Sequence, residues 1–320
     1  MVYLVFFLAA VVVVTAAIYL NQFGDVISKK SALSGAVVGT FLIAGATSLP
    51  ELTTSLTAVY IDNPDIAVGN MLGSNVFNLL ILAMVDLIYR KRRLFQRVDH
   101  SANIPSALIG LLFLAILILT LFLPGSIQFF GVGIEMILIF LLYIGAMKFV
   151  SSSGSEESED QVNSYSLRTA IIGFIIAAIV VFGSGSVLSI AGDRLAEATG
   201  MNASFVGSFL IAASTSLPEL VTVLAAFKLA NYNMAIGSIL GSNLFNIQLL
   251  VLTDVLYREG PILAAVGSSQ IFVALLGLLM TIVVIFLLIR PNKWITNQWR
   301  YAAPSLFMTV LYFVVTFALY

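Results

Sequence analysis

The chain has 320 residues, of which 60% are hydrophobic and only 10% are charged, and its formal net charge at pH 7 is −1. Soluble domains carry about 25% charged residues, so this composition places the chain in a lipid bilayer. The near-zero charge argues against nucleic acid as a partner. The absence of cysteine excludes disulfides, thiolate metal sites and cysteine nucleophiles.

The apolar stretches predict an all-α membrane protein, because a helix of about 20 apolar residues crosses a bilayer core of about 30 Å. The N-terminal stretch has no basic region and no small-residue cleavage site, so we interpret it as the first span and not as a signal peptide. In chain order the sequence predicts ten spans, near residues 2–21, 35–61, 65–88, 104–124, 128–149, 168–191, 203–229, 233–256, 269–290 and 301–319.

A polar segment separates the fifth predicted span from the sixth. Residues 151–167 are acidic and rich in serine, which is typical of a linker loop, and nothing in them indicates chemistry. The segment divides the chain into residues 1–150 and residues 168–320, with five predicted spans in each part.

The two parts are copies of one another at a spacing of 168 residues. TSLPE occurs at 47–51 and at 215–219, and GNMLGSNVFN at 69–78 matches GSILGSNLFN at 237–246. Because each copy has an odd number of spans, the second enters the membrane from the opposite side. Inverted repeats of this kind are typical of secondary transporters.

The distribution of lysine and arginine predicts the orientation of the spans. If the N-terminus is extracytoplasmic, 13 of the 15 basic residues fall in cytoplasmic loops, and only Arg194 and Arg258 lie outside. Basic residues collect on the cytoplasmic side of membrane proteins. Both termini are therefore predicted to be extracytoplasmic in a multi-pass protein of the cell membrane.

The TSLPE motif combines a helix break with a carboxylate. Pro50 has no N–H and clashes with the preceding turn, so the helix should break near residues 46–47 and release backbone carbonyls. Glu51 follows directly, and Thr47 and Ser48 add hydroxyl oxygens. The second copy supplies Thr215, Ser216, Pro218 and Glu219 in the same order.

The second motif places small and polar residues on the next span. Gly69 and Gly73 are four residues apart and allow close helix packing. Ser74 and Asn78 have the same spacing, so their side chains share a helix face. The second copy repeats the pattern with Gly237, Gly241, Ser242 and Asn246.

The two glutamates point to a bound cation. An ionisable group inside a bilayer is costly unless it is paired, and it is a functional-site hypothesis by default. Apart from Lys228, which lies at the very end of its span, no lysine or arginine lies within these spans to pair with Glu51 or Glu219. A ligand set made only of oxygen suits Ca²⁺ or Na⁺ and disfavours zinc and copper.

Other polar residues receive structural interpretations. Asp86 and Asp254 precede Arg90 and Arg258 by four residues, which predicts local ion pairs at the span ends. The GSGS segment at 183–186 is interpreted as small-residue packing, because no histidine lies in the membrane to serve a serine nucleophile. His100, the one histidine, is expected in a solvated loop.

These motifs resemble the α-repeats of the calcium/cation antiporter superfamily, specifically its sodium/calcium exchanger family of prokaryotic type. The repeats would cover about residues 38–90 and 206–258. The resemblance implies that Glu51 and Glu219 bind Ca²⁺ and Na⁺ in alternation. It also implies that the backbone carbonyls of Thr47 and Thr215 are ligands and that Asn78 and Asn246 border the centre. Flanking Na⁺ sites would be lined by Ser48, Ser74, Ser216, Ser242 and the carbonyls of Ala44 and Ala212.

One departure from the family pattern concerns Asn246, where related proteins often have aspartate. It leaves this site with one titratable group fewer and the Na⁺ stoichiometry and pH sensitivity open. The expectation is a monomeric, electrogenic Na⁺/Ca²⁺ antiporter working by alternating access, without enzymatic activity or a cofactor. The spans at 2–21 and 168–191 are expected to slide as its gate.

Two alternatives stay open at this point. The first is an exchanger of H⁺ for Ca²⁺ or for another divalent cation. The second is a channel or an intramembrane enzyme. A channel does not need matching inverted glutamates, and an enzyme would need a base or metal ligands that this sequence lacks.

Overall fold

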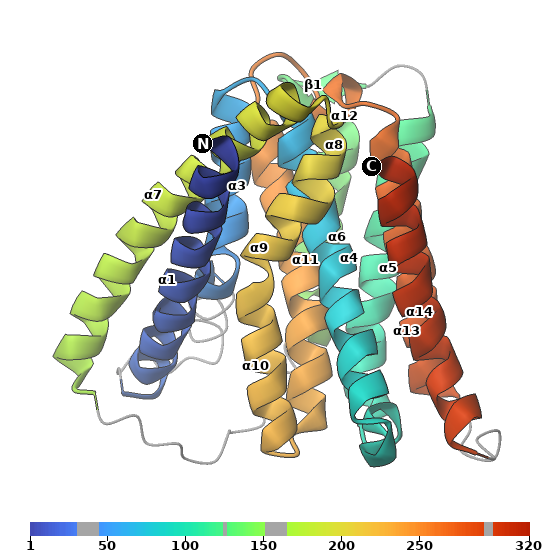
Figure 1. Cartoon of the computed structure of the whole chain (residues 1–320). Helices are drawn as coiled ribbons and strands as arrows, with labels where there is room; N and C mark the ends of the chain where they lie inside the picture. The colour runs from blue at the N-terminus through green and yellow to red at the C-terminus, as the bar shows by residue number, and fades with distance from the viewer. Residues whose placement is uncertain (31–44, 124–126, 151–164, 291–296) are drawn as a thin grey trace.

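The computed structural model describes residues 1–30, 45–123, 127–150, 165–290 and 297–320. Nearly all of these residues are helical, and the helices form one bundle (Figure 1). The elements are α1 (Val2–Lys30), α3 (Leu49–Tyr60), α4 (Pro64–Ile88), η1 (Arg90–Arg92), η2 (Leu94–Gln96), α5 (His100–Phe122), β1 (Gln128–Phe129), β2 (Val132–Gly133), α6 (Ile134–Val150), α7 (Leu167–Thr199), α8 (Ala203–Phe205), η4 (Val206–Ile211), α9 (Ala212–Thr215), α10 (Leu217–Lys228), α11 (Tyr232–Leu256), α12 (Ile262–Ala265), α13 (Ser269–Ile289) and α14 (Gln298–Leu319).

Seven helices in the described part of the chain are long and apolar enough to cross a membrane, and a bent pair raises this to eight. The bent pair joins residues 203–215 to α10 at an angle of 42°. The apolar part of α6, Ile134–Ala146, is shorter. The predicted span at 35–61 lies partly outside the described residues. The chain is therefore a multi-pass membrane protein, and its count of ten spans stays a prediction.

The fifth predicted span begins later than expected. Residues 128–133 form a hairpin of β1 and β2 instead of a helix. Its two turn residues, Phe130 and Gly131, have φ of 52° and 83°. Two successive residues with positive φ form the tight turn that joins antiparallel strands. The prediction of a helix from residue 128 was wrong for these six residues (128 to 133), and the hairpin is an exception to the all-α fold.

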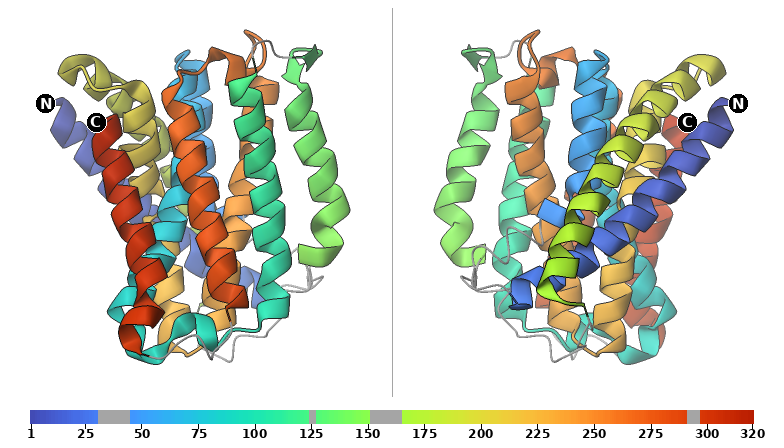
Figure 2. Two further views of the ribbon diagram at one scale, coloured as in Figure 1. Left: turned by 90° about the vertical axis from the view of Figure 1, so that its right-hand side faces the viewer. Right: turned by 90° about the vertical axis from the view of Figure 1, so that its left-hand side faces the viewer.

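The helices α1 and α7 lie side by side along one edge of the molecule and run obliquely to the other helices (Figures 1 and 2). They have 29 and 33 residues. At 1.5 Å per residue these lengths are about 44 and 50 Å, so both helices can cross a bilayer core of about 30 Å at a tilt. Isoleucines 171, 175 and 179 on α7 are exposed, as expected of a face against lipid.

Small residues let α7 pack closely against α3. A Cβ atom at Gly185 would overlap the side chain of Thr53. One residue further, the hydroxyl of Ser186 accepts a hydrogen bond of 2.9 Å from Thr57. The GSGS segment is thus a helix-packing surface, as predicted.

Contacts between the two halves repeat at the spacing of 168 residues. The Asp65 carboxylate at the start of α4 accepts a 2.9 Å hydrogen bond from the amide of Gly267, before α13. At the equivalent positions, the Asn233 side chain of α11 accepts a 2.7 Å bond from the amide of Asp99, before α5. Each half therefore fixes a loop of the other half in the same way.

The aspartates at the ends of α4 and α11 also hold the opposite half. Asp86 is buried and accepts hydrogen bonds from Tyr301 and from Ser305, the latter at 2.6 Å. Asp254 accepts bonds from the amides of Gly133 at 2.9 Å and Ile262 at 2.6 Å.

The predicted ion pairs of these aspartates with arginines were wrong. Arg90 is exposed and stacks over the ring of Trp299 at 5.4 Å, and Arg258 is exposed as well. Helical spacing puts each aspartate and arginine on one face, but the carboxylates accept hydrogen bonds inside the protein. Both donors to Asp86 come from the other half, whereas Asp254 has one donor from the other half, Gly133, and one from its own, Ile262.

Candidate ion-binding site

Each TSLPE motif interrupts its helix at a serine. Ser48 has φ −98° and ψ 10°, and Ser216 has φ −91° and ψ 5°. The next helices, α3 and α10, begin one residue later and carry the proline in their first turn. Since proline donates no hydrogen bond, the carbonyl four residues earlier loses its helical partner. The interruption lies one to two residues after the predicted position at 46–47.

Glu51 and Glu219 lie in the first turns of α3 and α10, and both are buried, with exposed fractions of 0% and 3%. One oxygen of Glu51 accepts a 3.2 Å hydrogen bond from Ser216, in the motif of the other half. Its second oxygen and both oxygens of Glu219 are buried without a hydrogen-bond partner in the described structure. The two carboxylates are close enough to interact electrostatically.

Hydroxyls and an amide lie near Glu51. The hydroxyls of Ser74 and Thr215 lie 3.4 Å apart, and Thr215 donates a 3.2 Å bond to Asn70. Asn70 in turn donates to the backbone carbonyl of Glu51 at 3.1 Å and to the hydroxyl of Thr54 at 2.6 Å. The sequence interpretation missed Asn70, although an asparagine four residues before Ser74, inside an apolar span, was a signal for it.

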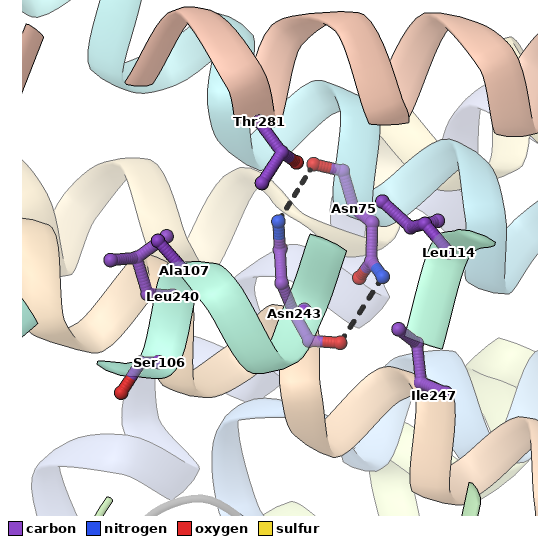
Figure 3. Close-up of a pocket in the computed structure, with 9 residues that line it drawn as sticks. Asn75, Ser106, Ala107, Leu114, Leu240, Asn243, Ile247 and Thr281 are labelled. Carbon is purple, nitrogen blue, oxygen red and sulfur yellow. Dashed lines mark hydrogen bonds between the residues drawn. The ribbon is translucent and has the colours of Figure 1, made fainter. Parts of the chain in front are cut away.

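Four asparagines join α4 to α11 through hydrogen bonds. Asn75 and Asn243 each donate a 3.1 Å bond to the backbone carbonyl of the other, as Figure 3 shows. Asn78 donates to Asn243 at 3.0 Å, and Asn246 donates to Asn75 at 3.1 Å. Asn75 and Asn243 were also missed from the sequence, although both repeats contain them in the GSN triplet.

Asn75 and Asn243 also line a small pocket between α4, α5, α11 and α13 (Figure 3). Its volume open to water-sized spheres is about 10 Å³, close to the minimum for one water molecule. The polar wall of this pocket includes Ser106 and Thr281, whereas the remaining lining residues are mostly apolar.

Most of the predicted ligands are buried. Asn78, Asn246, Ser48, Ser74, Thr215 and Ser216 are fully buried, and Thr47 and Ser242 are 8% exposed. The carbonyl of Ala212 accepts hydrogen bonds from the amide of Ser216 at 3.0 Å and the hydroxyl of Thr215 at 3.3 Å. Ala44 lies outside the described residues.

Several buried oxygens of the two motifs lack a hydrogen-bond partner in the described structure. The buried side-chain oxygens without a partner among the described residues include six on Ser48, Glu51, Asn78, Glu219 and Asn246. A buried polar atom that lacks a partner costs about 1–3 kcal/mol, and more if it is charged, so six such oxygens on five side chains favour a bound cation. Within the described ranges, no three His, Cys, Asp or Glu side chains gather as a metal cluster, so most ligands would be neutral oxygens.

Comparison with known proteins gives a match along almost the whole chain. The sequence profile of the family described as "Sodium/calcium exchanger protein" matches residues 1–149 and 169–320. A putative antiporter, CaxA, from Alkalimonas amylolytica is 27% identical over 277 residues, which cover 83% of each chain. The sodium/calcium exchanger MaX1 of Methanosarcina acetivorans is 23% identical and covers 98% of each chain.

Two kinds of solved structure share the fold. The sodium-calcium exchanger NCX_Mj, soaked with 100 mM Na⁺ and 10 mM Sr²⁺, has a TM-score of 0.62 at 23% identity over 98% of both chains. The H⁺/Ca²⁺ exchanger CAX has a TM-score of 0.66 at 15% identity, over 99% of this chain and 88% of its own. At these identities the similarity establishes the fold alone.

Proposed function

The chain belongs to the sodium/calcium exchanger protein family, whose profile covers both of its halves, and on that premise we propose that it exchanges Na⁺ for Ca²⁺ across the cell membrane. Glu51 and Glu219 bind the ions in alternation. The neutral oxygens of Thr47, Thr215, Ser48, Ser216, Ser74, Ser242, Asn78, Asn246, Ala44 and Ala212 complete the sites.

The observation that carries this proposal is the pair of buried carboxylates, for which the described residues supply no cationic partner. Three of their four oxygens accept no hydrogen bond from the described residues. An empty site with two bare charges is costly to carry through lipid, because charges lose hydration there. One Ca²⁺ or several Na⁺ ions neutralise it, so the loaded protein switches access more readily than the empty one. That difference produces exchange instead of leakage.

The neutral oxygens favour sodium as the driving ion. Hydroxyl and carbonyl oxygens coordinate Na⁺, but they do not take up a proton for transport. A proton-driven carrier would depend on Glu51 and Glu219 alone and would exchange at most two charges for each Ca²⁺. A sodium-driven carrier also fills the serine-lined flanks and moves excess charge, and each excess charge gains about 2.3 kcal/mol per 100 mV.

The architecture in this proposal is ten spans in two inverted repeats, residues 1–150 and 168–320, with both termini extracytoplasmic. The hydrogen bonds that recur at a spacing of 168 residues support the repeat. Support for the orientation comes from the two ends of α4. The turn before α4 lies at the end of the bundle that carries both termini, and basic η1 lies at the other end (Figure 1).

Exchange of H⁺ for Ca²⁺ is the second candidate, because the fold match to the H⁺/Ca²⁺ exchanger is as good as that to the sodium-calcium exchanger. Uptake of ⁴⁵Ca²⁺ into vesicles, at clamped potential and with either a Na⁺ or a pH gradient, separates the two. We expect uptake that requires a Na⁺ gradient and responds to the potential. Uptake driven by a pH gradient without Na⁺ would establish the second candidate instead.

A further inference from the structure

The four asparagines between α4 and α11 suggest a role beyond helix packing. We propose that Asn75 and Asn243 are positioning residues, which keep the side-chain oxygens of Asn246 and Asn78 available to the cation. This inference rests on the proposed function, since it assigns a second layer of residues behind the same site.

The orientation of the first two amides follows from the partners they have. A backbone carbonyl only accepts hydrogen bonds. The carbonyl of Asn243 lies 3.1 Å from the amide nitrogen of Asn75, and the reciprocal distance is also 3.1 Å. A flip of either amide would place two acceptors against each other. The nitrogen of each side chain is therefore fixed toward the opposite backbone, and its oxygen is fixed toward the next asparagine.

The second pair of amides is then determined by the first. The oxygen of Asn75 accepts from the nitrogen of Asn246 at 3.1 Å, and the oxygen of Asn243 accepts from the nitrogen of Asn78 at 3.0 Å. With their nitrogens engaged, Asn246 and Asn78 keep their oxygens free. Both oxygens are buried and have no partner in the described structure.

This chain of bonds matters because a carboxamide has two different ends. Its oxygen can bind a cation, but its NH₂ group cannot. Without Asn75, the amide of Asn246 loses the acceptor that distinguishes its two orientations, so part of the population presents NH₂ to the ion. Each positioning residue acts on the other half: Asn75 of α4 on Asn246 of α11, and Asn243 of α11 on Asn78 of α4.

The test measures ⁴⁵Ca²⁺ binding to purified full-length protein without Na⁺, so it does not depend on which ion drives transport. Asn75→Leu and Asn243→Leu should each raise the Kd about tenfold, equivalent to about 1.4 kcal/mol. Thr281→Val is the matched control, because Thr281 lines the same pocket but donates only to Gly277 of its own helix at 2.7 Å. It should leave the Kd unchanged. Should the leucine variants fail to fold, Asn75→Ala and Asn243→Ala replace them, since alanine removes the same hydrogen bonds without adding bulk beside the pocket.

A double-mutant cycle separates positioning from a merely structural role. In an Asn246→Ala background, Asn75→Leu should change the Kd by less than twofold, because the amide it orients is gone. Asn243→Leu should behave likewise in an Asn78→Ala background. Full tenfold effects in both backgrounds, or a wild-type Kd in the single variants, would overturn the positioning role while the proposed function stands. Absence of Ca²⁺ binding by the unmodified protein would overturn both.

Discussion

The hydroxyl of Tyr301 donates a hydrogen bond to the buried carboxylate of Asp86, which ties the last helix, α14, to the end of α4. Tyr301 and Gly133 occupy equivalent positions in the two repeats, and so do Asp86 and Asp254. Because Gly133 donates to Asp254 at 2.9 Å, each aspartate holds the start of the final helix of the opposite half. The chemistry differs, since one donor is a phenol and the other a backbone amide.

Tyr301→Phe should lower the stability of the protein, because it leaves Asp86 with the Ser305 hydroxyl as its one side-chain donor in the described structure. Loss of a hydrogen bond to a buried charged group costs about 1–3 kcal/mol. The thermal unfolding midpoint in detergent, measured without Ca²⁺, should fall by several degrees. Thr309→Val is the control on the same helix, because its hydroxyl donates to the carbonyl of Ser305 within α14. Equal midpoints for both variants would contradict a stabilising role of the hydrogen bond between Tyr301 and Asp86.

Glu51→Gln and Glu219→Gln should each abolish Ca²⁺ transport and leave the fold intact, because each removes half of the negative charge of the site. The measurement is ⁴⁵Ca²⁺ uptake into vesicles, together with thermal unfolding to check the fold. Glu135→Gln provides a matched control, since Glu135 is another buried glutamate, 5% exposed, at the start of α6. Normal uptake in either site variant would remove that glutamate from the site.

Gly73→Ala should destabilise the protein, since a Cβ atom there would overlap the backbone of Ser208 in the π-helix η4. Overpacking of this kind costs about 1–3 kcal/mol. In Gly110→Ala, the control, the nearest described side-chain atom to the new Cβ would be Cδ2 of Leu244, at an ordinary 3.7 Å. Exchange of a mid-helix glycine for alanine gains about 0.5–1 kcal/mol, so the control should be neutral or stabilising. The measurement is the thermal unfolding midpoint of each variant in detergent, and a Gly73→Ala midpoint equal to that of Gly110→Ala would contradict the prediction.

Single cysteines should report the orientation of the chain, which has no cysteine of its own. Lys91→Cys in η1 should react with a membrane-impermeant maleimide from the cytoplasmic side only. Tyr60→Cys, at an exposed position before the turn into α4, should react only from outside. Labelling of both positions from one side would refute the ten-span topology, because α4 alone separates them.

Asn246→Asp should make Ca²⁺ flux sensitive to pH. When protonated, the acid has the shape of the amide and can still donate to Asn75. When ionised, it cannot donate and places a third negative charge beside Glu51 and Glu219, which slows the release of Ca²⁺. Flux should therefore fall below the wild-type rate as the pH rises, and it should still require Na⁺. Asn202→Asp is the control, because aspartate also caps a helix at this exposed position. Parallel pH profiles for wild type and Asn246→Asp would contradict the expectation.

The sequence predicts the helical membrane fold well because its information is local and repeated. The length of an apolar stretch indicates a span directly. The TSLPE motif predicts both a helix break and a buried charge, and neither prediction depends on a distant residue. Comparison of the two copies adds a check that a single motif lacks. The interruptions at Ser48 and Ser216 accordingly lie within two residues of the predicted positions.

The rest of the structure depends on contacts that periodicity does not encode. Asp86 has an arginine four residues away, yet its partners lie 215 and 219 residues later in the chain. The apolar sequence of the π-helix at Val206–Ile211 fits an α-helix equally well. Only the structure shows that this segment packs against Gly73 of the other half. Asn75 likewise resembles any polar residue of a packed helix until Asn243 lies opposite.

The reciprocal aspartate contacts bear on how the protein is synthesised. Asp86 leaves the ribosome more than 200 residues before the donors that satisfy it, Tyr301 and Ser305. When the N-terminal half has been synthesised, the carboxylate of Asp86 therefore lacks its hydrogen-bond donors. The amide of Gly133 in the hairpin likewise lacks its acceptor, because Asp254 has not yet been translated. Only the final helix supplies the donors to Asp86, so a chain truncated before α14 would leave this buried carboxylate without both hydrogen bonds.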